Sequence, residues 1–123
     1  MRKKKTERQK LVERLDDLTR SILYKRFGKS CVMCESTEQI GVGHVFSRKH
    51  LATRWDVDEE GNCYPQCWKH NFNHVRDQYP YFHWFEQKYG VESLQRLRER
   101  HTTTTHLKDW QLREKVKEYE SLV

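Results

Sequence analysis

Four cysteines and one histidine limit what this chain can fold into. Cys31 and Cys34 are separated by two residues, and a second group of Cys63, Cys67 and His70 follows. A Cys-x-x-Cys pair combined with a second pair of ligands at the start of a helix is typical of a tetrahedral structural zinc site. A chain of 123 residues with 35% hydrophobic residues buries a modest apolar core, and small cores often need a metal cross-link.

Five candidate ligands compete for four positions around one zinc ion. The two-residue gap between Cys67 and His70 suits the first turn of a helix, whereas Cys63 would have to reach the ion from a strand. We therefore predict the ligand set Cys31, Cys34, Cys67 and His70, with an all-cysteine site containing Cys63 as the alternative. In the predicted set, Cys63 is a small buried hydrophobic residue.

The chain is expected to be cytoplasmic. It contains no apolar run that is long enough to cross a membrane. Its first residues, Met-Arg-Lys-Lys-Lys, lack the apolar stretch of a secretory signal. In a reducing compartment the thiols stay available for metal and do not form disulfides.

The excess positive charge is confined to residues 1–30. This segment holds 11 Lys and Arg against 4 Asp and Glu, while the whole chain has a net charge of +6. We predict a basic arm that binds the nucleic-acid backbone, with Lys3, Lys4 and Lys5 neutralising phosphates. The alternative is a solvated tail that has no partner.

The apolar pattern predicts an α+β chain that is mostly helical. The expected elements are a helix over 6–27 ending at Gly28, a zinc knuckle and short β-hairpin within 31–46, irregular chain over 47–61, a strand over 62–66, and helices over 68–78, 81–89, 91–100 and 106–122. We divide the chain into a basic helical arm (1–30), a core (31–79) and C-terminal helices that pack on the core (80–123).

His44 lies between the two groups of zinc ligands, and Asn71 directly follows His70. Hydrolysis of a phosphodiester near neutral pH needs a base, and histidine has a suitable pKa. It also needs a divalent cation to neutralise the phosphate. A zinc cross-link between hairpin and helix would place His44 opposite Asn71. The alternative is that His44 is a structural residue in a strand.

His44, Asn62 and the His70-Asn71 pair resemble the HNH, or ββα-metal, nuclease motif. More narrowly, the chain resembles the phage NinG (Rap) family of recombination nucleases over roughly residues 20–100. The segments that carry this resemblance are Gly43-His44-Val-Phe-Ser-Arg48, Ala52-Thr-Arg-Trp-Asp56, Asn62-x-x-Pro-Gln-Cys67 and Tyr89-Gly90. It implies a zinc-stapled, treble-clef-like ββα-metal core flanked by N- and C-terminal helices.

The resemblance implies a role for each site residue. His44 would be the general base, and Asn62 would tether the loop that keeps His44 oriented. Asn71 would bind the catalytic Mg²⁺ or Mn²⁺, with His74 as a second ligand. Arg48 would reach the scissile or a neighbouring phosphate, a task that suits a planar guanidinium.

Two arginines complete the predicted DNA contacts, and two positions depart from the family pattern. Arg48 and Arg54 are expected to bind DNA together with the lysines of the arm, and Asp56 is expected to cap a turn or pair with Arg54. Family members usually carry cysteine at the position of His70. Many HNH enzymes carry an acidic or histidine ligand where this chain has Gly43.

The expected function is metal-dependent cleavage of DNA by an endonuclease that leaves a 5′-phosphate. The resemblance implies branched or recombination intermediates as substrates, and the host cytoplasm as the location if the chain is phage-encoded. Resolution of a junction would require two sites and therefore a homodimer. The alternatives are a non-catalytic zinc module that binds DNA, and an accessory protein of phage recombination or packaging that docks through the C-terminal helix.

Overall fold

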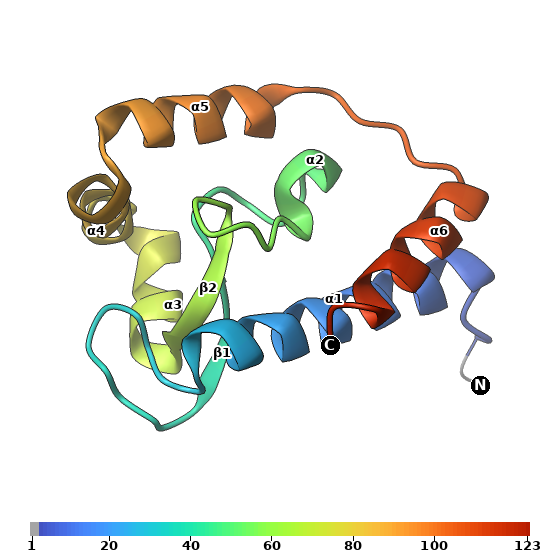
Figure 1. Cartoon of the computed structure of the whole chain (residues 1–123), viewed down its shortest axis with the longest axis horizontal. Helices are drawn as coiled ribbons and strands as arrows, with labels where there is room; N and C mark the ends of the chain where they lie inside the picture. Colours follow the sequence, from blue (N-terminus) through green and yellow to red (C-terminus); the bar gives the residue numbers. More distant parts are fainter. Residues whose placement is uncertain (1–2) are drawn as a thin grey trace.

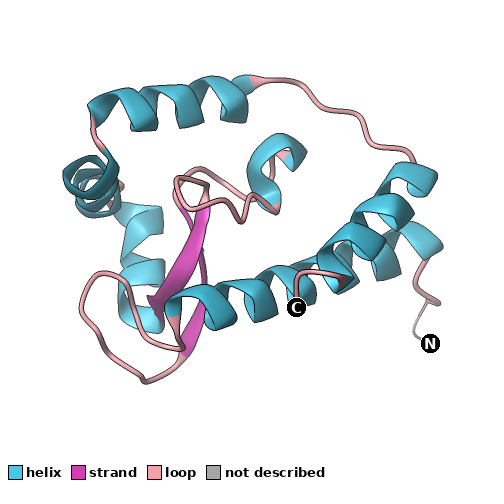
Figure 2. Cartoon of the chain, in the orientation of Figure 1, coloured by secondary structure: helices cyan, strands magenta, loops and turns pink. Residues whose placement is uncertain are grey.

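The computed structural model describes residues 3–123, which form an α+β fold with six helices and a two-stranded sheet (Figure 1 and Figure 2). The elements in chain order are α1 (Glu7–Phe27), β1 (Ile40–His44), α2 (Leu51–Arg54), β2 (Cys63–Cys67), α3 (Trp68–Arg76), α4 (Tyr79–Tyr89), α5 (Val91–Thr102) and α6 (Asp109–Glu120). The predicted α+β class is confirmed.

Local signals define the ends of α1. The Thr6 side chain accepts a hydrogen bond from the backbone of Gln9, and the Gln9 side chain accepts one from the backbone of Thr6, which is a capping box. At the other end Gly28 adopts φ 80°, a left-handed conformation that favours glycine. The predicted helix over 6–27 is therefore confirmed to within one residue.

The strand pair corrects one prediction. A short hairpin was expected within residues 31–46, but β1 pairs antiparallel with β2, in a register from Ile40 opposite Cys67 to His44 opposite Cys63. The segment before β1 instead forms the turn of the cysteine knuckle, where Glu35 donates its backbone N–H to the carbonyl of Cys31. The predicted strand over 62–66 is β2, shifted by one residue, and the predicted irregular region contains the short helix α2.

Two apolar clusters lie on either side of the strand pair. The first joins α1, α6 and the segment after α2, and its buried residues include Leu15, Leu18, Trp55, Cys63 and Leu112. The second joins the residues after β1 to α4 and α5, and includes Val45, Tyr64, Tyr81, Phe85 and Leu97. From α1 onward, the segment expected as an arm is thus part of a core, and α6 packs along it (Figure 1).

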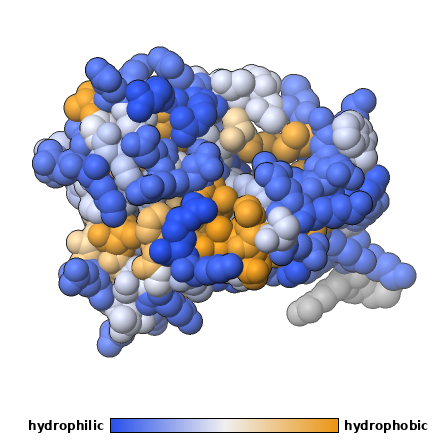
Figure 3. All heavy atoms as spheres, viewed as in Figure 1, coloured by the Kyte–Doolittle hydropathy of each residue, from blue (hydrophilic) through white to orange (hydrophobic). Residues whose placement is uncertain are grey.

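The surface is mostly hydrophilic. Figure 3 shows one face, on which apolar side chains gather near the centre and on the side where α3 lies. Within residues 3–123, no helix combines the length and the apolar character needed to span a bilayer.

Candidate functional site

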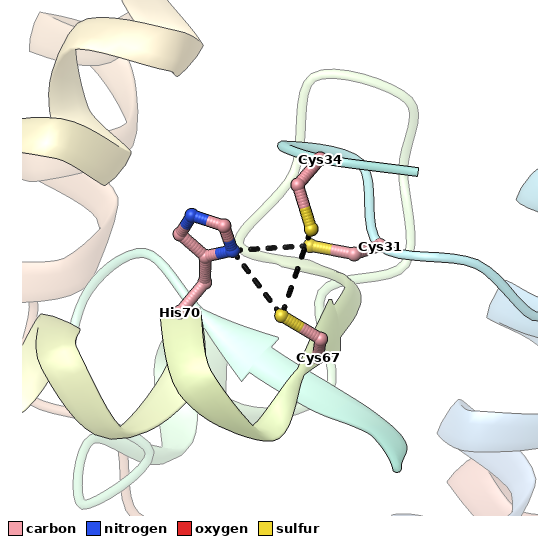
Figure 4. A group of neighbouring side chains, drawn as sticks. All are labelled: Cys31, Cys34, Cys67 and His70. Atoms are coloured by element: carbon pink, nitrogen blue, oxygen red, sulfur yellow. Dashed lines mark hydrogen bonds between the residues drawn. The ribbon is translucent and has the colours of Figure 1, made fainter. Parts of the chain in front are cut away.

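Four side chains form a cluster that could hold a metal ion. The ligand atoms of Cys31, Cys34, Cys67 and His70 all lie within 4.8 Å of one another (Figure 4). The Sγ atoms of Cys34 and Cys67 are 3.8 Å apart. His70 Nδ1 lies 3.8 Å from Cys31 Sγ and 3.2 Å from Cys67 Sγ.

These distances fit a tetrahedral zinc site. With Zn–S bonds of about 2.3 Å and Zn–N bonds of about 2.0 Å, tetrahedral angles put two sulfurs about 3.8 Å apart and a sulfur and a nitrogen about 3.5 Å apart. The observed S–S separation of 3.8 Å matches the first value, and the two S–N separations of 3.8 and 3.2 Å lie on either side of the second. Three thiols and one imidazole are also a donor set that zinc prefers in closed structural sites.

The local fold explains why these four residues meet. Cys67 is both the last residue of β2 and the N-cap of α3, so His70 follows on the first turn of the helix. The backbone N–H of Val32 donates to the carbonyl of Pro65, which holds the knuckle against β2. Cys63 lies at the other end of β2, fully buried, and burial raises the pKa of its thiol well above the ordinary value. Cys63 is thus a core residue, as predicted.

A cavity of about 510 Å³ lies between α1, β1 and α3. Five of the residues singled out from the sequence line it: His44, Arg48, Arg54, Asn71 and His74. The fold therefore brings together side chains from β1, the segment around α2, and α3. The Cys₃His cluster adjoins this cavity, because His70 of the cluster directly precedes Asn71 of the cavity lining.

His44 has one ring nitrogen engaged. Its Nε2 lies 2.9 Å from the carbonyl oxygen of Arg54, and a carbonyl can only accept, so Nε2 carries the proton. The neutral ring then has its lone pair on Nδ1. Burial lowers the pKa of His44 below its ordinary value, and the neighbouring charges of Arg48 and Arg54 act in the same direction.

Asn62 is fully buried and does not line the cavity. Its Oδ1 accepts from the backbone N–H of Phe46 at 2.8 Å, and its Nδ2 donates to the carbonyls of Phe46 at 2.9 Å and Thr53 at 3.1 Å. These bonds tie the segment after β1 to α2. Asn62 thus acts on the cavity only through the backbone that it holds in place.

Asn71 and His74 lie on α3 and differ in what they offer to the cavity. Asn71 Nδ2 points to the carbonyl of Val42 at 3.4 Å, which leaves Oδ1 as the atom for a ligand. His74 Nε2 donates to the carbonyl of Val45 at 2.8 Å, and its Nδ1 is buried without a partner. The His74 ring, held edge-on against Tyr81, therefore supports the loop after β1 and offers no open nitrogen in this position.

Arg54 is paired, and its partner is not the one expected from the sequence. Its guanidinium binds Asp16 on α1 through two bonds of 3.1 and 2.8 Å. Asp56 instead pairs with Arg100 at 3.2 Å and accepts from the backbone N–H of Asp58 at 3.3 Å. Of the two roles expected for Asp56, the turn cap is therefore confirmed and the pair with Arg54 is wrong. The turn at Trp55 directs the two side chains to different neighbours, which local sequence spacing does not reveal.

Asp16 is a residue of the cavity that the sequence reasoning missed. Burial raises its pKa, but hydrogen bonds from Arg54 and Trp55 outweigh this effect and hold the pKa below its ordinary value. Arg48, also at this cavity, makes no ion pair with any carboxylate of the described chain. Asp16 follows the buried Leu15 in α1, but a carboxylate next to an apolar residue does not by itself indicate a cavity.

A second hollow continues from the first toward the N-terminus. It is lined by Lys3, Lys4, Lys5 and Glu13, which pairs with Lys5 at 2.8 Å, and it shares Asp16, Arg48 and Arg54 with the first cavity. The predicted phosphate-binding lysines therefore lie beside the candidate site. Residues 1–2 of the predicted arm lie outside the described residues.

Gly43 has a packing role. A Cβ added there would lie 2.1 Å from Oε1 of Gln66, a fully buried residue of β2. Neighbouring residues of a strand point to opposite faces, so this position faces away from the side of β1 that carries His44. The absence of an acidic residue before His44 thus has a steric reason.

The chain matches no protein-family model, and neither a curated protein nor a solved structure is matched by it. Its function must therefore be argued from the Cys₃His cluster and the adjoining cavity.

Proposed function

We propose that this chain is a metal-dependent endonuclease that hydrolyses phosphodiester bonds in DNA. The proposal rests on one observation, which is that His44, Asn71 and Arg48 line the same cavity. These residues provide a base, an amide oxygen for a cation, and a guanidinium for phosphate. The order β1, β2, α3 with a zinc-binding cluster at the start of the helix also suits a ββα-metal core.

His44 is the proposed general base. Its Nε2–H donates to the carbonyl of Arg54, so Nδ1 is the atom that would take a proton from water. The hydroxide formed would attack phosphorus, and the bond to the 3′ oxygen would break. The products would be a 5′-phosphate and a 3′-hydroxyl. Burial keeps the imidazole neutral and therefore ready to act as a base.

Asn71 is the proposed protein ligand of the catalytic ion. Mg²⁺ or Mn²⁺ held there would neutralise the phosphate and stabilise the leaving oxygen, and Mg²⁺ prefers few protein ligands because it keeps several waters. Asn71 Nδ2 donates to the backbone carbonyl of Val42, two residues before His44 on β1. The Asn71 and His44 side chains line the same cavity, where the phosphate and the hydrated ion would have to fit between ligand and base.

Arg48 and the lysines of the second hollow would bind the DNA backbone. Arg48 is shared by the two hollows, so phosphates that flank the reacting one can meet Lys3, Lys4 and Lys5. Branched or recombination DNA is the substrate class that the resemblance suggests, and a homodimer would supply the two sites that junction resolution needs.

One observation favours a second candidate function, a zinc module that binds DNA without cutting it. Many HNH enzymes carry a metal ligand at the position of Gly43, and here the side chain of Gln66 fills the space that any Cβ would need. Such a module would keep the Cys₃His cluster and the cationic hollows. It would show no metal-dependent cleavage.

The test compares cleavage of plasmid and four-way-junction DNA by wild type, His44→Ala, Asn71→Ala and His106→Ala, with and without Mg²⁺ or Mn²⁺. His106 is exposed and lies outside both hollows, so His106→Ala is the matched control. We expect cleavage only with the divalent ion. We also expect a loss of at least about 100-fold in both His44→Ala and Asn71→Ala, with DNA binding retained.

Circular dichroism and zinc content would show that each variant is folded. Folded His44→Ala that cuts as well as wild type would disprove the proposed base. Metal-independent or absent cleavage by wild type, with tight DNA binding, would support the non-catalytic module instead.

A further inference from the structure

A stripe of three exposed apolar side chains, two of them aromatic, runs along α3 beside the candidate site. Trp68 is 61% exposed, Phe72 52% and Val75 83%. The Trp68 and Phe72 rings stack with their centroids 5.3 Å apart and an angle of 15° between their planes. We call these three residues the α3 stripe. Large apolar side chains this exposed need an explanation when they are contiguous.

The α3 stripe adjoins the cavity. Val75 belongs to both, because it lines the cavity together with Asn71. With about 100° of rotation per residue, Asn71 lies on the flank of the stripe that faces the cavity. A nucleotide with its phosphate near Asn71 would therefore have its base next to Trp68 and Phe72.

The charge of α3 matches a polyanion. The helix contains Lys69 and Arg76 and no acidic residue. These two cations are seven residues apart, which is about two turns, so they lie on one flank of the stripe, opposite Asn71. An aromatic stack with a cavity on one side and cations on the other suits a nucleic-acid strand, whose bases stack while its phosphates pair with cations.

A second copy of this chain would fit the α3 stripe less well than a nucleic-acid strand. A symmetric dimer through α3 would bring Lys69 and Arg76 of the two copies together without acids on the helix to compensate them. Three side chains also fall short of the roughly 800 Å² per partner that a stable interface buries.

We propose that the α3 stripe is a stacking platform for bases of an unpaired DNA strand that enters the site. The inference rests on the proposed function for the position of the phosphate, and it narrows the substrate to DNA with a single-stranded segment, such as a fork or a flap. The two rings already form a stack, and a base can extend it on an outer face. Such stacking tolerates any base sequence.

The test is a binding measurement without added Mg²⁺ or Mn²⁺, so that cleavage does not interfere. Wild type, Trp68→Leu with Phe72→Leu, and Trp110→Leu are titrated into oligo-dT, blunt duplex and forked duplex that carry a fluorescent label. Aminopurine in the unpaired strand reports stacking directly. Trp110 on α6 is 55% exposed and lines a separate surface, so Trp110→Leu is the matched control.

We expect the double variant to bind oligo-dT and the unpaired arm of the fork about 5- to 150-fold more weakly, because it loses the stacking of at least one base. Its aminopurine quenching should disappear. Its affinity for blunt duplex should change by less than about twofold, and Trp110→Leu should behave as wild type.

Three results would overturn the proposal: wild-type affinity of the double variant for oligo-dT, an equal loss on blunt duplex, or a dimer on a sizing column that the double variant abolishes while DNA binding persists. Failure of the nuclease proposal would be visible separately. In that case folded His44→Ala would match wild-type cleavage, or wild type would not cleave with metal, whatever the oligo-dT result.

Discussion

His44 is held in one tautomer and one orientation by a single backbone carbonyl. The Nε2–H bond to Arg54 ties the ring to the residue that ends α2, and Asn62 ties α2 to the segment after β1. The candidate site therefore depends on backbone groups as much as on side chains. Buried groups with a shifted pKa beside a cavity are candidates for function.

The pH dependence of cleavage follows from burial of His44. A general base acts in its neutral form, and burial lowers the pKa of His44 below the ordinary histidine value. We therefore expect kcat/KM to stay constant as the pH falls through the ordinary value and to decline only at lower pH. A pH profile on labelled duplex or forked DNA measures this. A decline that begins above the ordinary histidine value would contradict it.

A substitution at Gly43 tests how closely β1 packs against the side chain of Gln66. A Cβ at this position would overlap the side chain of Gln66, whereas a Cβ at Gly41 would meet no atom within 4 Å. We expect Gly43→Ala to lower the free energy of unfolding by about 1–3 kcal/mol and Gly41→Ala to change it far less. Denaturant unfolding measures both, and equal effects would show that the contact with Gln66 is unimportant.

At the scale of elements, the Cys₃His cluster joins a turn, a strand and a helix. Cys31 and Cys34 come from the knuckle turn, Cys67 ends β2, and His70 lies on α3. α3 contains no buried residue, and the cluster lies at its first turn. We therefore expect a metal ion bound to the cluster to stabilise the position of the helix that carries Asn71 and the α3 stripe.

Loss of a metal ligand should therefore unfold this part of the molecule. We expect wild type to bind one zinc per chain and Cys34→Ser to lose both the zinc and the cooperative melting transition, since zinc binding supplies on the order of 10 kcal/mol in small domains. Cys63→Ala should melt at a lower temperature but keep its zinc. Zinc assays and thermal melts measure this, and zinc retained by Cys34→Ser would exclude it as a ligand.

In the whole molecule, α1 contributes both to the apolar core and to the candidate binding cavity. One face of α1 packs in the first apolar cluster with α6, while Asp16, Thr19 and Arg20 line the cavity. The N-terminal lysines extend the cavity into a second hollow. Folding of the helix thus places Lys3, Lys4 and Lys5 in a hollow that adjoins the cavity of His44.

The salt dependence of DNA binding should show whether the N-terminal lysines contact the DNA backbone. Each phosphate contact makes the slope of log affinity against log salt concentration more negative by about 0.9. We expect replacement of Lys3, Lys4 and Lys5 by glutamine to make this slope less negative by about 2–3. The control is Lys115→Gln with Lys117→Gln on α6, which should leave it unchanged. Equal slopes for wild type and the N-terminal variant would show that these lysines are solvated.

Features with local causes could be predicted from the sequence. The ends of α1 follow from Thr6 and Gly28, and the pairing of Cys67 with His70 follows from their spacing on one helical turn. The hairpin and the Arg54–Asp56 pair were wrong because both were inferred between sequence neighbours. The actual partners, β2 and Asp16, are distant in the chain.

The sequence by itself thus predicted the five longer helices, the four residues of the Cys₃His cluster and the candidate base, because capping, periodicity and ligand spacing act over a few residues. Only the tertiary structure decided which strand pairs with β1, that Asp16 holds Arg54, that His74 is turned to a backbone carbonyl, and that an aromatic stripe stays uncovered beside the cavity. These outcomes depend on which distant surfaces bury one another, and burial is a property of the whole fold.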